Sequence, residues 1–366
     1  RMFLQRNFNN QFWLVMKVFV LCSFLLFCNV NCQTLYNVVL HGDHVDALTA
    51  SKTHLYAVIN AESRFDKPLY LSELTFDLES SRNLSISRTL ISEDVNLIYD
   101  PTREYLYITS GWKVLTVDLS TFSILYEGWG GSNFQSNAAF TTDFNTLYIA
   151  ARVNHTWGFT QLSLPDLTFI QRNVIQSINN CVPNNSSFFY GQSFWCDSLG
   201  ESYPNTAICY GKVFNPHERF KVYQIDLNTW TSSAYTFGYM IATTKVGNPG
   251  VYITQDVGKQ LLIEGTDNNL NRDWATIVSD IEEYETGIAA SENYVFVTGR
   301  IWGDQETGTI VRIQKSDPSN QIFLQMPGTI CGTGEEMNPM VAVSDNMVFA
   351  VRFSNEGTNM ITKFAY

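Results

Sequence analysis

Short apolar runs alternate with short polar turns along most of the chain, a pattern typical of strands rather than helices. The clearest stretch covers residues 95–125 and contains these apolar segments: Asn96–Tyr99, Tyr105–Thr109, Val114–Asp118 and Ser123–Tyr126. Turn-forming residues separate them, such as Asp100-Pro101-Thr102 and Ser110-Gly111. This stretch therefore predicts four short strands in succession.

The same short apolar motif recurs along the chain. It occurs at Leu55–Val58, Leu106–Thr109, Leu147–Ala150, Ala207–Tyr210, Leu261–Glu264, Val295–Thr298 and Val348–Val351. A repeat of this kind, with four short strands per unit, is typical of a β-propeller. We therefore predict an all-β, seven-bladed β-propeller with four-stranded antiparallel blades. The uneven spacing of the copies leaves six and eight blades as alternatives.

One unit also resembles a known repeat. Residues Tyr99 to Ile108 (YDPTREYLYI), followed by Val117 to Thr121 (VDLST), are similar to the repeat of YVTN-type and lactonase-like β-propellers. The match is looser at Thr141–Ala151 and Lys221–Trp230. The resemblance implies one propeller domain over about residues 35–366. It does not name a function, because such folds host enzymes, receptors and scaffolds alike.

The two ends of this domain are expected to pair. The last unit offers only three strands: Met340–Ser344, Met347–Phe353 and Met360–Tyr366. Leu35–Leu40 precedes the first full unit and can supply the missing outer strand. An open propeller would leave unpaired strand edges, so we predict that this N-terminal strand closes the C-terminal blade.

Residues 1–32 have the pattern of a secretory signal peptide. Lys17 precedes the apolar run Val18 to Phe27, and Val30 and Cys32 have the spacing of a signal-peptidase site. Met16 is the expected true start. The alternative is an uncleaved signal anchor, although the apolar span is short for a bilayer. The sequence thus predicts a secreted, extracellular protein with no membrane span after cleavage.

The charge balance bears on the partners of the protein. The formal net charge is −12, and removal of residues 1–32 leaves 20 Lys and Arg against 35 Asp and Glu, a charge of −15. Such a surface repels polyanions, which argues against nucleic acid as a partner. Otherwise an acidic surface indicates only solubility.

Cysteines and glycosylation sequons agree with secretion. Four cysteines remain after the leader, namely Cys181, Cys196, Cys209 and Cys331, and they allow three pairings. A hairpin of Gln192–Ser198 with Thr206–Gly211 would place Cys196 opposite Cys209, within disulfide reach, and leave Cys181 to pair with Cys331. The sequons begin at Asn83, Asn154, Asn184 and Asn185.

A short polar side chain stands before the first strand of most units. These residues are Asp46, Asn96, Asn137, Gln192, Asn248, Thr286 and Asn338. In a propeller they would form a ring of oxygens at one mouth of the central channel, where a hard cation such as calcium could bind. Lactonases on this fold are similar in placing Asn, Asp and Glu there, whereas this chain has mostly amides. The alternative is that these residues only shape the turns.

Two functions follow as hypotheses. The first is a secreted propeller that binds an extracellular protein or carbohydrate without catalysis. The second is a calcium-dependent lactonase or esterase-like hydrolase, in which Asp46 and the Asn ring hold the ion that polarises the substrate carbonyl. The sequence contains no nucleophile elbow of the G-x-S-x-G type.

Overall fold

The structure, a computed structural model, is described for the following parts of the chain. They are residues 36–40, 43–61, 69–87, 95–110, 113–129, 139–141, 143–153, 156–174, 194–198, 206–211, 221–236, 240–246, 251–256, 260–267, 269–279, 281–282, 287–301, 307–327, 329–330, 341–344, 346–353 and 359–366. The chain divides into two compact units, residues 1–35 with Ala365 and residues 36–364 with Tyr366. Apart from Ala365, the described residues all belong to the second unit, and the predicted signal peptide lies outside them.

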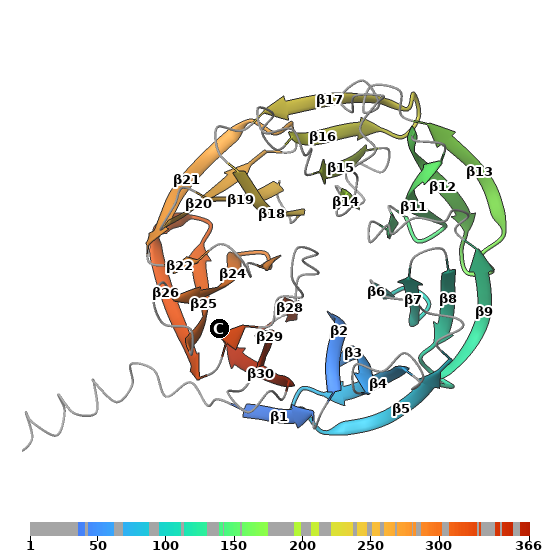
Figure 1. Cartoon of the computed structure of the whole chain (residues 1–366), viewed down its shortest axis with the longest axis horizontal. Helices are drawn as coiled ribbons and strands as arrows, with labels where there is room; N and C mark the ends of the chain where they lie inside the picture. The colour runs from blue at the N-terminus through green and yellow to red at the C-terminus, as the bar shows by residue number, and fades with distance from the viewer. Residues whose placement is uncertain are drawn as a thin grey trace, which may run out of the picture. The chain divides into compact units, whose positions relative to one another are not determined.

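Strands of the first part of the second unit form antiparallel sheets of four, each in chain order (Figure 1). The first sheet comprises β2 (Asp43–Ala50), β3 (His54–Ala61), β4 (Leu69–Thr75) and β5 (Ser80–Ile86). The second comprises β6 (Val95–Asp100), β7 (Tyr105–Ser110), β8 (Lys113–Asp118) and β9 (Ser123–Trp129). The third comprises β10 (Ala139–Thr141), β11 (Thr146–Val153), β12 (Thr156–Ser163) and β13 (Phe169–Val174).

The next two sheets repeat this order. The fourth comprises β14 (Phe194–Ser198), β15 (Thr206–Gly211), β16 (Lys221–Asp226) and β17 (Thr231–Thr236). The fifth comprises β18 (Met240–Val246), β19 (Val251–Asp256), β20 (Gln260–Thr266) and β21 (Arg272–Ser279).

The sixth and seventh sheets differ in their first strand, which is present as two short pieces. The sixth comprises β22 (Ile281–Glu282), β23 (Ile288–Ala290), β24 (Tyr294–Ile301), β25 (Thr307–Gln314) and β26 (Asp317–Pro327), with both β22 and β23 paired to β24. The seventh comprises β27 (Thr329–Ile330), β28 (Val341–Ser344), β29 (Met347–Phe353), β30 (Asn359–Ala365) and β1 (Tyr36–Leu40). Seven antiparallel sheets are thus present in the described residues.

The N-terminal strand pairs with the C-terminal strand. β1 runs antiparallel to β30, with Tyr36 opposite Lys363 and Leu40 opposite Asn359. β1 is therefore the outer strand of the sheet whose other strands come from the end of the chain. This is the pairing that the sequence predicts for the two terminal segments.

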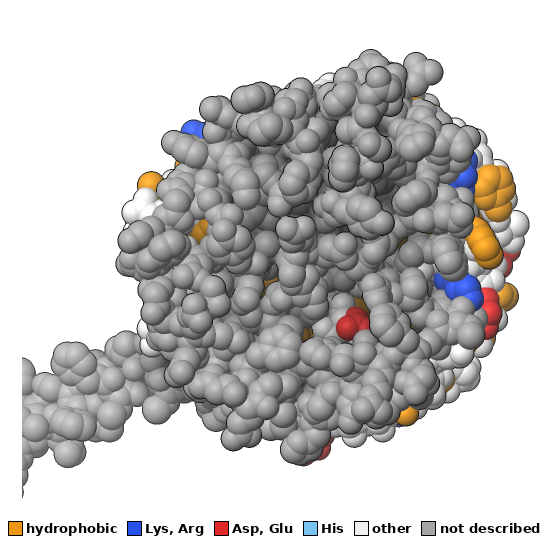
Figure 2. Space-filling model, in the orientation of Figure 1, with side chains coloured by type: hydrophobic (Ala, Val, Ile, Leu, Met, Phe, Trp, Pro, Cys, Tyr) orange, Lys and Arg blue, Asp and Glu red, His pale blue; other side chains and the backbone are white. Residues whose placement is uncertain are grey.

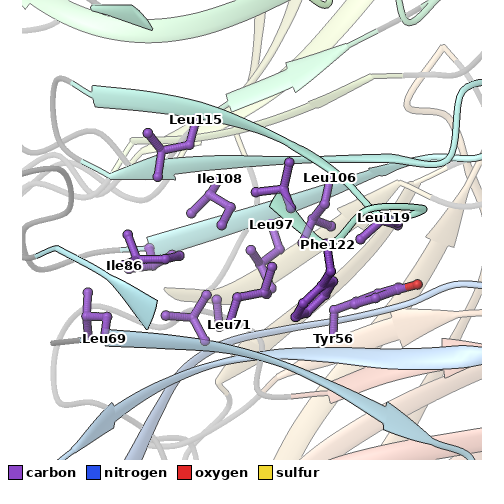
Figure 3. Close-up of a cluster of buried hydrophobic side chains, with 14 residues drawn as sticks. Tyr56, Leu69, Leu71, Ile86, Leu97, Leu106, Ile108, Leu115, Leu119 and Phe122 are labelled. Carbon is purple, nitrogen blue, oxygen red and sulfur yellow. The ribbon is translucent and has the colours of Figure 1, made fainter. Parts of the chain in front are cut away.

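The core lies between successive sheets. One buried cluster joins the first sheet to the second, where Tyr56, Leu71 and Ile86 pack against Leu106 and Phe122 (Figure 3). Buried residues follow one another in the middle strands, as in β7, where Leu106 to Ser110 are all buried. Because successive side chains of a strand point to opposite faces, such a sheet has two buried faces and needs a neighbour on both sides. Burial between sheets therefore accounts for the repeat of the apolar motif.

The last sheet also packs against the first. Phe349, Val351 and Ile361 of the seventh sheet share one buried cluster with Leu55 and Leu74 of the first. Further clusters join the second sheet to the third and the fifth to the sixth. The first and last sheets thus have the same kind of interface as sheets that are neighbours in sequence.

A bulky residue in a left-handed conformation occurs in the turn before the outer strand of five sheets. These residues are Leu78, Phe122, Leu167, Trp230 and Leu270, with φ between 50° and 63°. Backbone of this kind costs free energy for a bulky residue, which burial of the side chain offsets. Phe122 belongs to the cluster shared with the preceding sheet, and Leu167 adjoins Gly128 of the preceding outer strand. The turns therefore hold neighbouring sheets together.

The Asp100 side chain of the second sheet accepts five hydrogen bonds. Its carboxylate is fully buried and accepts hydrogen bonds from the backbone N–H and hydroxyl of Thr102, the backbone N–H and guanidinium of Arg103, and the Tyr107 hydroxyl. Arg103 also donates to the Phe144 carbonyl at 2.6 Å, in the third sheet's first turn. Asp100 thus organises a turn and, through Arg103, a contact between two sheets.

Two other ion pairs join sheets in a similar way. Arg82 binds the buried Glu73 carboxylate of its own sheet, with 2.9 Å between Nε and Oε1. The Arg82 Cζ atom also lies 4.6 Å from the ring centroid of Phe122 in the next sheet. Lys363, whose side chain is 5% exposed, donates to the Phe76 carbonyl and to Asp77 at 2.8 Å. The second contact connects the last sheet to the first.

Candidate functional site

The predicted oxygen ring depends on the first strands of the sheets. The first strands contact one another between neighbouring sheets, as β2 does with both β6 and β28. In Figure 1, β2, β6, β14, β18 and β28 lie toward the middle of the drawing, and β5, β9, β13, β17, β21 and β26 lie at its margin. Two residues of the predicted ring, Asp46 and Asn96, belong to the described part of the chain and lie on β2 and β6.

Asp46 lies at a β-bulge. Val45 is opposite Ile59 and Ala47 is opposite Val58, so Asp46 has no Cα partner on β3. Asp46 is half-buried and makes a hydrogen-bond or electrostatic contact with another group of the protein. A bulge redirects a side chain and is over-represented near binding sites, which makes Asp46 the better supported of the two candidates.

Asn96 connects two sheets. It is half-buried on β6, opposite Thr109 on β7, and its amide nitrogen donates to the Ala139 carbonyl at 3.2 Å. Ala139 is the first residue of β10 in the next sheet. The Asn96 amide therefore holds the first strands of two sheets together, a role that the turn-shaping hypothesis did not include.

The remaining residues of the predicted ring lie outside the described residues: Asn137, Gln192, Asn248, Thr286 and Asn338. Among the described residues there is no group of three or more His, Cys, Asp or Glu side chains that could hold a metal ion. The ring and its calcium ion therefore stay predictions.

The structure brings the two cysteines of the predicted hairpin into register. Cys196 on β14 and Cys209 on β15 are Cα partners in the antiparallel pair. Directly opposite residues of such a pair lie about 4.5–5.5 Å apart at Cα, which suits a disulfide. The second predicted pair, Cys181 with Cys331, lies outside the described residues.

Of the four predicted glycosylation positions, Asn83 is described. It is exposed on β5, the outer strand of the first sheet, and accepts a hydrogen bond from the Ser72 hydroxyl at 2.6 Å. Asn154, Asn184 and Asn185 lie outside the described residues.

Sequence reasoning missed a half-buried lysine. The Lys315 Nζ lies 4.6 Å from the centroid of the buried Tyr252 ring, which belongs to the preceding sheet. Burial lowers the pKa of Lys315 to about 8, against a weaker effect of Glu292 that raises it. A lysine in a polar turn reads as solvated in sequence, so no pattern signals this environment.

Comparison with known proteins gives similarity in structure but not in sequence. No protein-family model and no curated protein matches the sequence. A chain in the crystal structure of the mitotic checkpoint complex is similar in structure, with 10% identity, coverage of 90% of this chain and 93% of that chain, and a TM-score of 0.55. The β-propeller domain of Myceliophteria thermophila Cps50 (Swd1) is likewise 10% identical, with coverage of 90% and 98% and a TM-score of 0.56.

These similarities show a β-propeller fold. At 10% identity they show the fold alone, and they do not single out the YVTN and lactonase-like group. The all-β prediction with antiparallel four-stranded sheets is confirmed. No helix within the described residues has the length and apolar character needed to cross a membrane.

Proposed function

We propose that this protein is a secreted, seven-bladed, closed β-propeller that binds an extracellular protein or carbohydrate and does not catalyse a reaction. The observation that carries the propeller part of the proposal is the packing of seven antiparallel sheets, each against the next, in the described residues. The pairing of β1 with β30 and the cluster shared by the first and last sheets support closure.

Binding is supported by the fold. One similar propeller was solved as part of the mitotic checkpoint complex, so the fold serves there within an assembly. In the present chain the buried ionisable groups Asp100, Glu73 and Lys363 bind other parts of the protein. Their hydrogen bonds connect turns and neighbouring sheets, so these three groups serve the packing of the protein. Membership of the YVTN group remains part of this proposal.

Secretion is supported by three features of the sequence. They are the apolar run of residues 18–27, the four sequons and the even number of cysteines that follow the leader. The register of Cys196 with Cys209 adds a structural argument, because a disulfide there would need an oxidising compartment.

Expression of the full chain in a eukaryotic secretory host tests the proposal. We expect protein in the medium that begins near Gln33, carries a Cys196–Cys209 disulfide and loses one glycan in the variant Asn83→Gln. Asn320→Gln, at an exposed position outside any sequon, should leave the glycans unchanged. The purified protein should bind on arrays of extracellular proteins and glycans. Retention in the cell with reduced cysteines would contradict secretion, and folded protein that binds nothing on the arrays would contradict the binding function.

Thermal unfolding with calcium or with a chelator separates the proposal from a channel-mouth hydrolase. We expect calcium to leave the Tm unchanged to within about 1 °C, because the Asn96 amide serves a contact between sheets. A calcium-dependent rise that disappears in Asp46→Ala/Asn137→Ala, but persists when the exposed Asp273 is changed to Ala, would favour the hydrolase instead.

A further inference from the structure

Two neighbouring outer strands carry exposed apolar side chains. Leu125, Tyr126 and Trp129 lie on β9, and Phe169 and Ile170 lie on β13, with exposed fractions from 40% to 60%. We name these five residues the β9/β13 patch. Figure 2 shows hydrophobic side chains along the right-hand margin, where β9 and β13 lie in Figure 1.

The two strands of the patch lie next to each other. A Cβ added to Gly128 on β9 would lie 2.6 Å from the Cβ of Leu167, in the turn that leads into β13. Trp129 follows Gly128 directly, and Phe169 lies two residues after Leu167. The patch is therefore one surface across two sheets and not two isolated strips.

The fold does not require an apolar residue at the β-bulge of the outer strands. An extra residue stands at the same bulge of four outer strands: Ser81 on β5, Leu125 on β9, Ile170 on β13 and Asp273 on β21. In the first and fifth sheets this residue is polar, as expected for a solvated edge. Among these four strands, the apolar choice is confined to the second and third sheets, which indicates a function for this edge.

We propose that the β9/β13 patch binds a short amphipathic segment of another protein, with apolar residues on one side and basic residues on the other. The inference rests on the proposed binding function and gives it a surface and a class of partner. Apolar patches of a few hundred Å² on soluble proteins mark interaction sites.

The area of the patch favours a short segment over a second copy. Five side chains that are about half exposed amount to a few hundred Å², since a whole aromatic side chain buries about 150–250 Å². A stable interface between folded proteins needs about 800 Å² from each partner. Two copies without residues 1–32, each with a formal charge of −15, would also repel each other.

The shape of the edge argues against addition of a strand. Bulges at Leu125 and Ile170 interrupt the regular ladder of β9 and β13, and bulged edges resist pairing with a further strand. Recognition through side chains is therefore favoured over recognition through the backbone. An apolar side of a helix or turn can supply such contacts.

The charges around the patch favour a basic partner. Glu127 lies exposed within β9. Asp166 lies exposed in the turn before β13 and keeps its negative charge while it accepts hydrogen bonds from the Ser163 and Thr168 hydroxyls. The basic groups nearby are less available, because Lys113 and Arg172 are half-buried and the Arg172 Nε binds the Thr160 hydroxyl at 3.1 Å. Basic residues that flank the apolar contacts would therefore be attracted, and binding should weaken with salt.

Selection from a random twelve-residue peptide library displayed on phage tests the inference with the full, secreted chain. We expect enrichment of peptides that combine Phe, Leu or Ile with Lys or Arg. Synthetic versions should bind the variant Leu125→Thr/Phe169→Thr/Ile170→Thr at least about tenfold more weakly than the wild type. The matched control Ile277→Thr/Phe323→Thr alters exposed apolar residues on the outer strands β21 and β26 and should bind as the wild type does.

A second variant distinguishes loss of peptide binding from loss of folding. Glu127→Lys changes one exposed charge, and we expect it to weaken peptide binding and its salt dependence while the Tm stays unchanged. No enrichment, or equal loss in the control variant, would overturn the inference. A wild-type dimer that the triple variant disperses would also overturn it and assign the patch to a second copy. If the triple variant still binds on the protein and glycan arrays, the proposed function stands without this surface.

Discussion

Replacement of Asp100 by Ala should destabilise the protein by about 3 kcal/mol, because it removes one acceptor from five donors at once. Thr102 and Arg103 would each lose two hydrogen bonds, and the buried Tyr107 hydroxyl would lose its bond of 3.1 Å. Burial raises the pKa of Tyr107, so its hydroxyl stays protonated and needs an acceptor. Urea unfolding at pH 7 measures the loss.

A variant in the turn between β8 and β9 of the same sheet provides the control for Asp100. Asp118 also accepts hydrogen bonds from its own turn, including the Ser120 N–H at 2.8 Å, but this contact is exposed to solvent. We expect Asp118→Ala to cost about 1 kcal/mol, since water replaces the lost partner. Equal losses in the two variants would contradict the central role of the buried carboxylate.

The pH dependence of the stability difference between the wild type and Asp100→Ala has a defined sign. Burial alone would raise the pKa of Asp100, but hydrogen bonds from Thr102 and Arg103 outweigh it and hold the pKa below its usual range. An acid with a lowered pKa in the folded state contributes stability above its unfolded pKa of about 3.9. The contribution is lost as the pH falls through the folded pKa. The difference between wild type and Asp100→Ala should therefore be constant near neutrality and shrink below about pH 4.

The order of the strands could be predicted from the sequence because each strand is short, apolar and followed by a turn with a mechanism. Asp100-Pro101-Thr102 is a turn in the structure, and the Asp100 carboxylate accepts from the N–H two residues later, as an Asx-turn requires. The pairing of the terminal strands could be predicted from the three-strand last unit, because a missing strand must come from elsewhere in the chain.

The contacts between sheets could not be predicted in the same way. Leu78, Phe122 and Leu167 have a positive φ that nothing in their side chains favours, and only packing against the preceding sheet explains it. Asn96 lies on the first strand as predicted, but its hydrogen bond to the Ala139 carbonyl depends on how two sheets approach each other. The distances between neighbouring sheets depend on the packing of the whole domain, and the repeat in the sequence does not predict them.

The exposed apolar patch illustrates a further limit. In sequence, β9 and β13 read as ordinary strands with apolar and polar residues, and their exposure follows only from their place at the outer edge of two sheets. Apolar residues are normally taken as core residues, so the sequence alone assigns Leu125 and Phe169 to packing. The structure separates the residues that pack from those that face solvent.

A cross-link between the first and last strands should produce the largest gain in stability. Leu40 and Asn359 are Cα partners at one end of the β1–β30 pair, so the double variant Leu40→Cys/Asn359→Cys should form a disulfide. The bond would close a loop of most of the chain, and the chain-entropy model gives about 6 kcal/mol for loops of this length. Urea unfolding of the oxidised variant, compared with the matched variant Leu40→Ser/Asn359→Ser under the same oxidising conditions, measures the gain, and peptide mapping identifies the bond.

The matched control moves one cysteine out of register. Asn37 is opposite Thr362 and not Asn359, so Asn37→Cys/Asn359→Cys places the two thiols three residues apart along the ladder, about 10 Å at the rise of a strand. This separation exceeds the reach of a disulfide, and the control should remain reduced. If both variants formed the bond equally, the terminal segments would lack a fixed register. If only the in-register variant forms it and the midpoint rises, the two ends of the chain jointly hold the last sheet together.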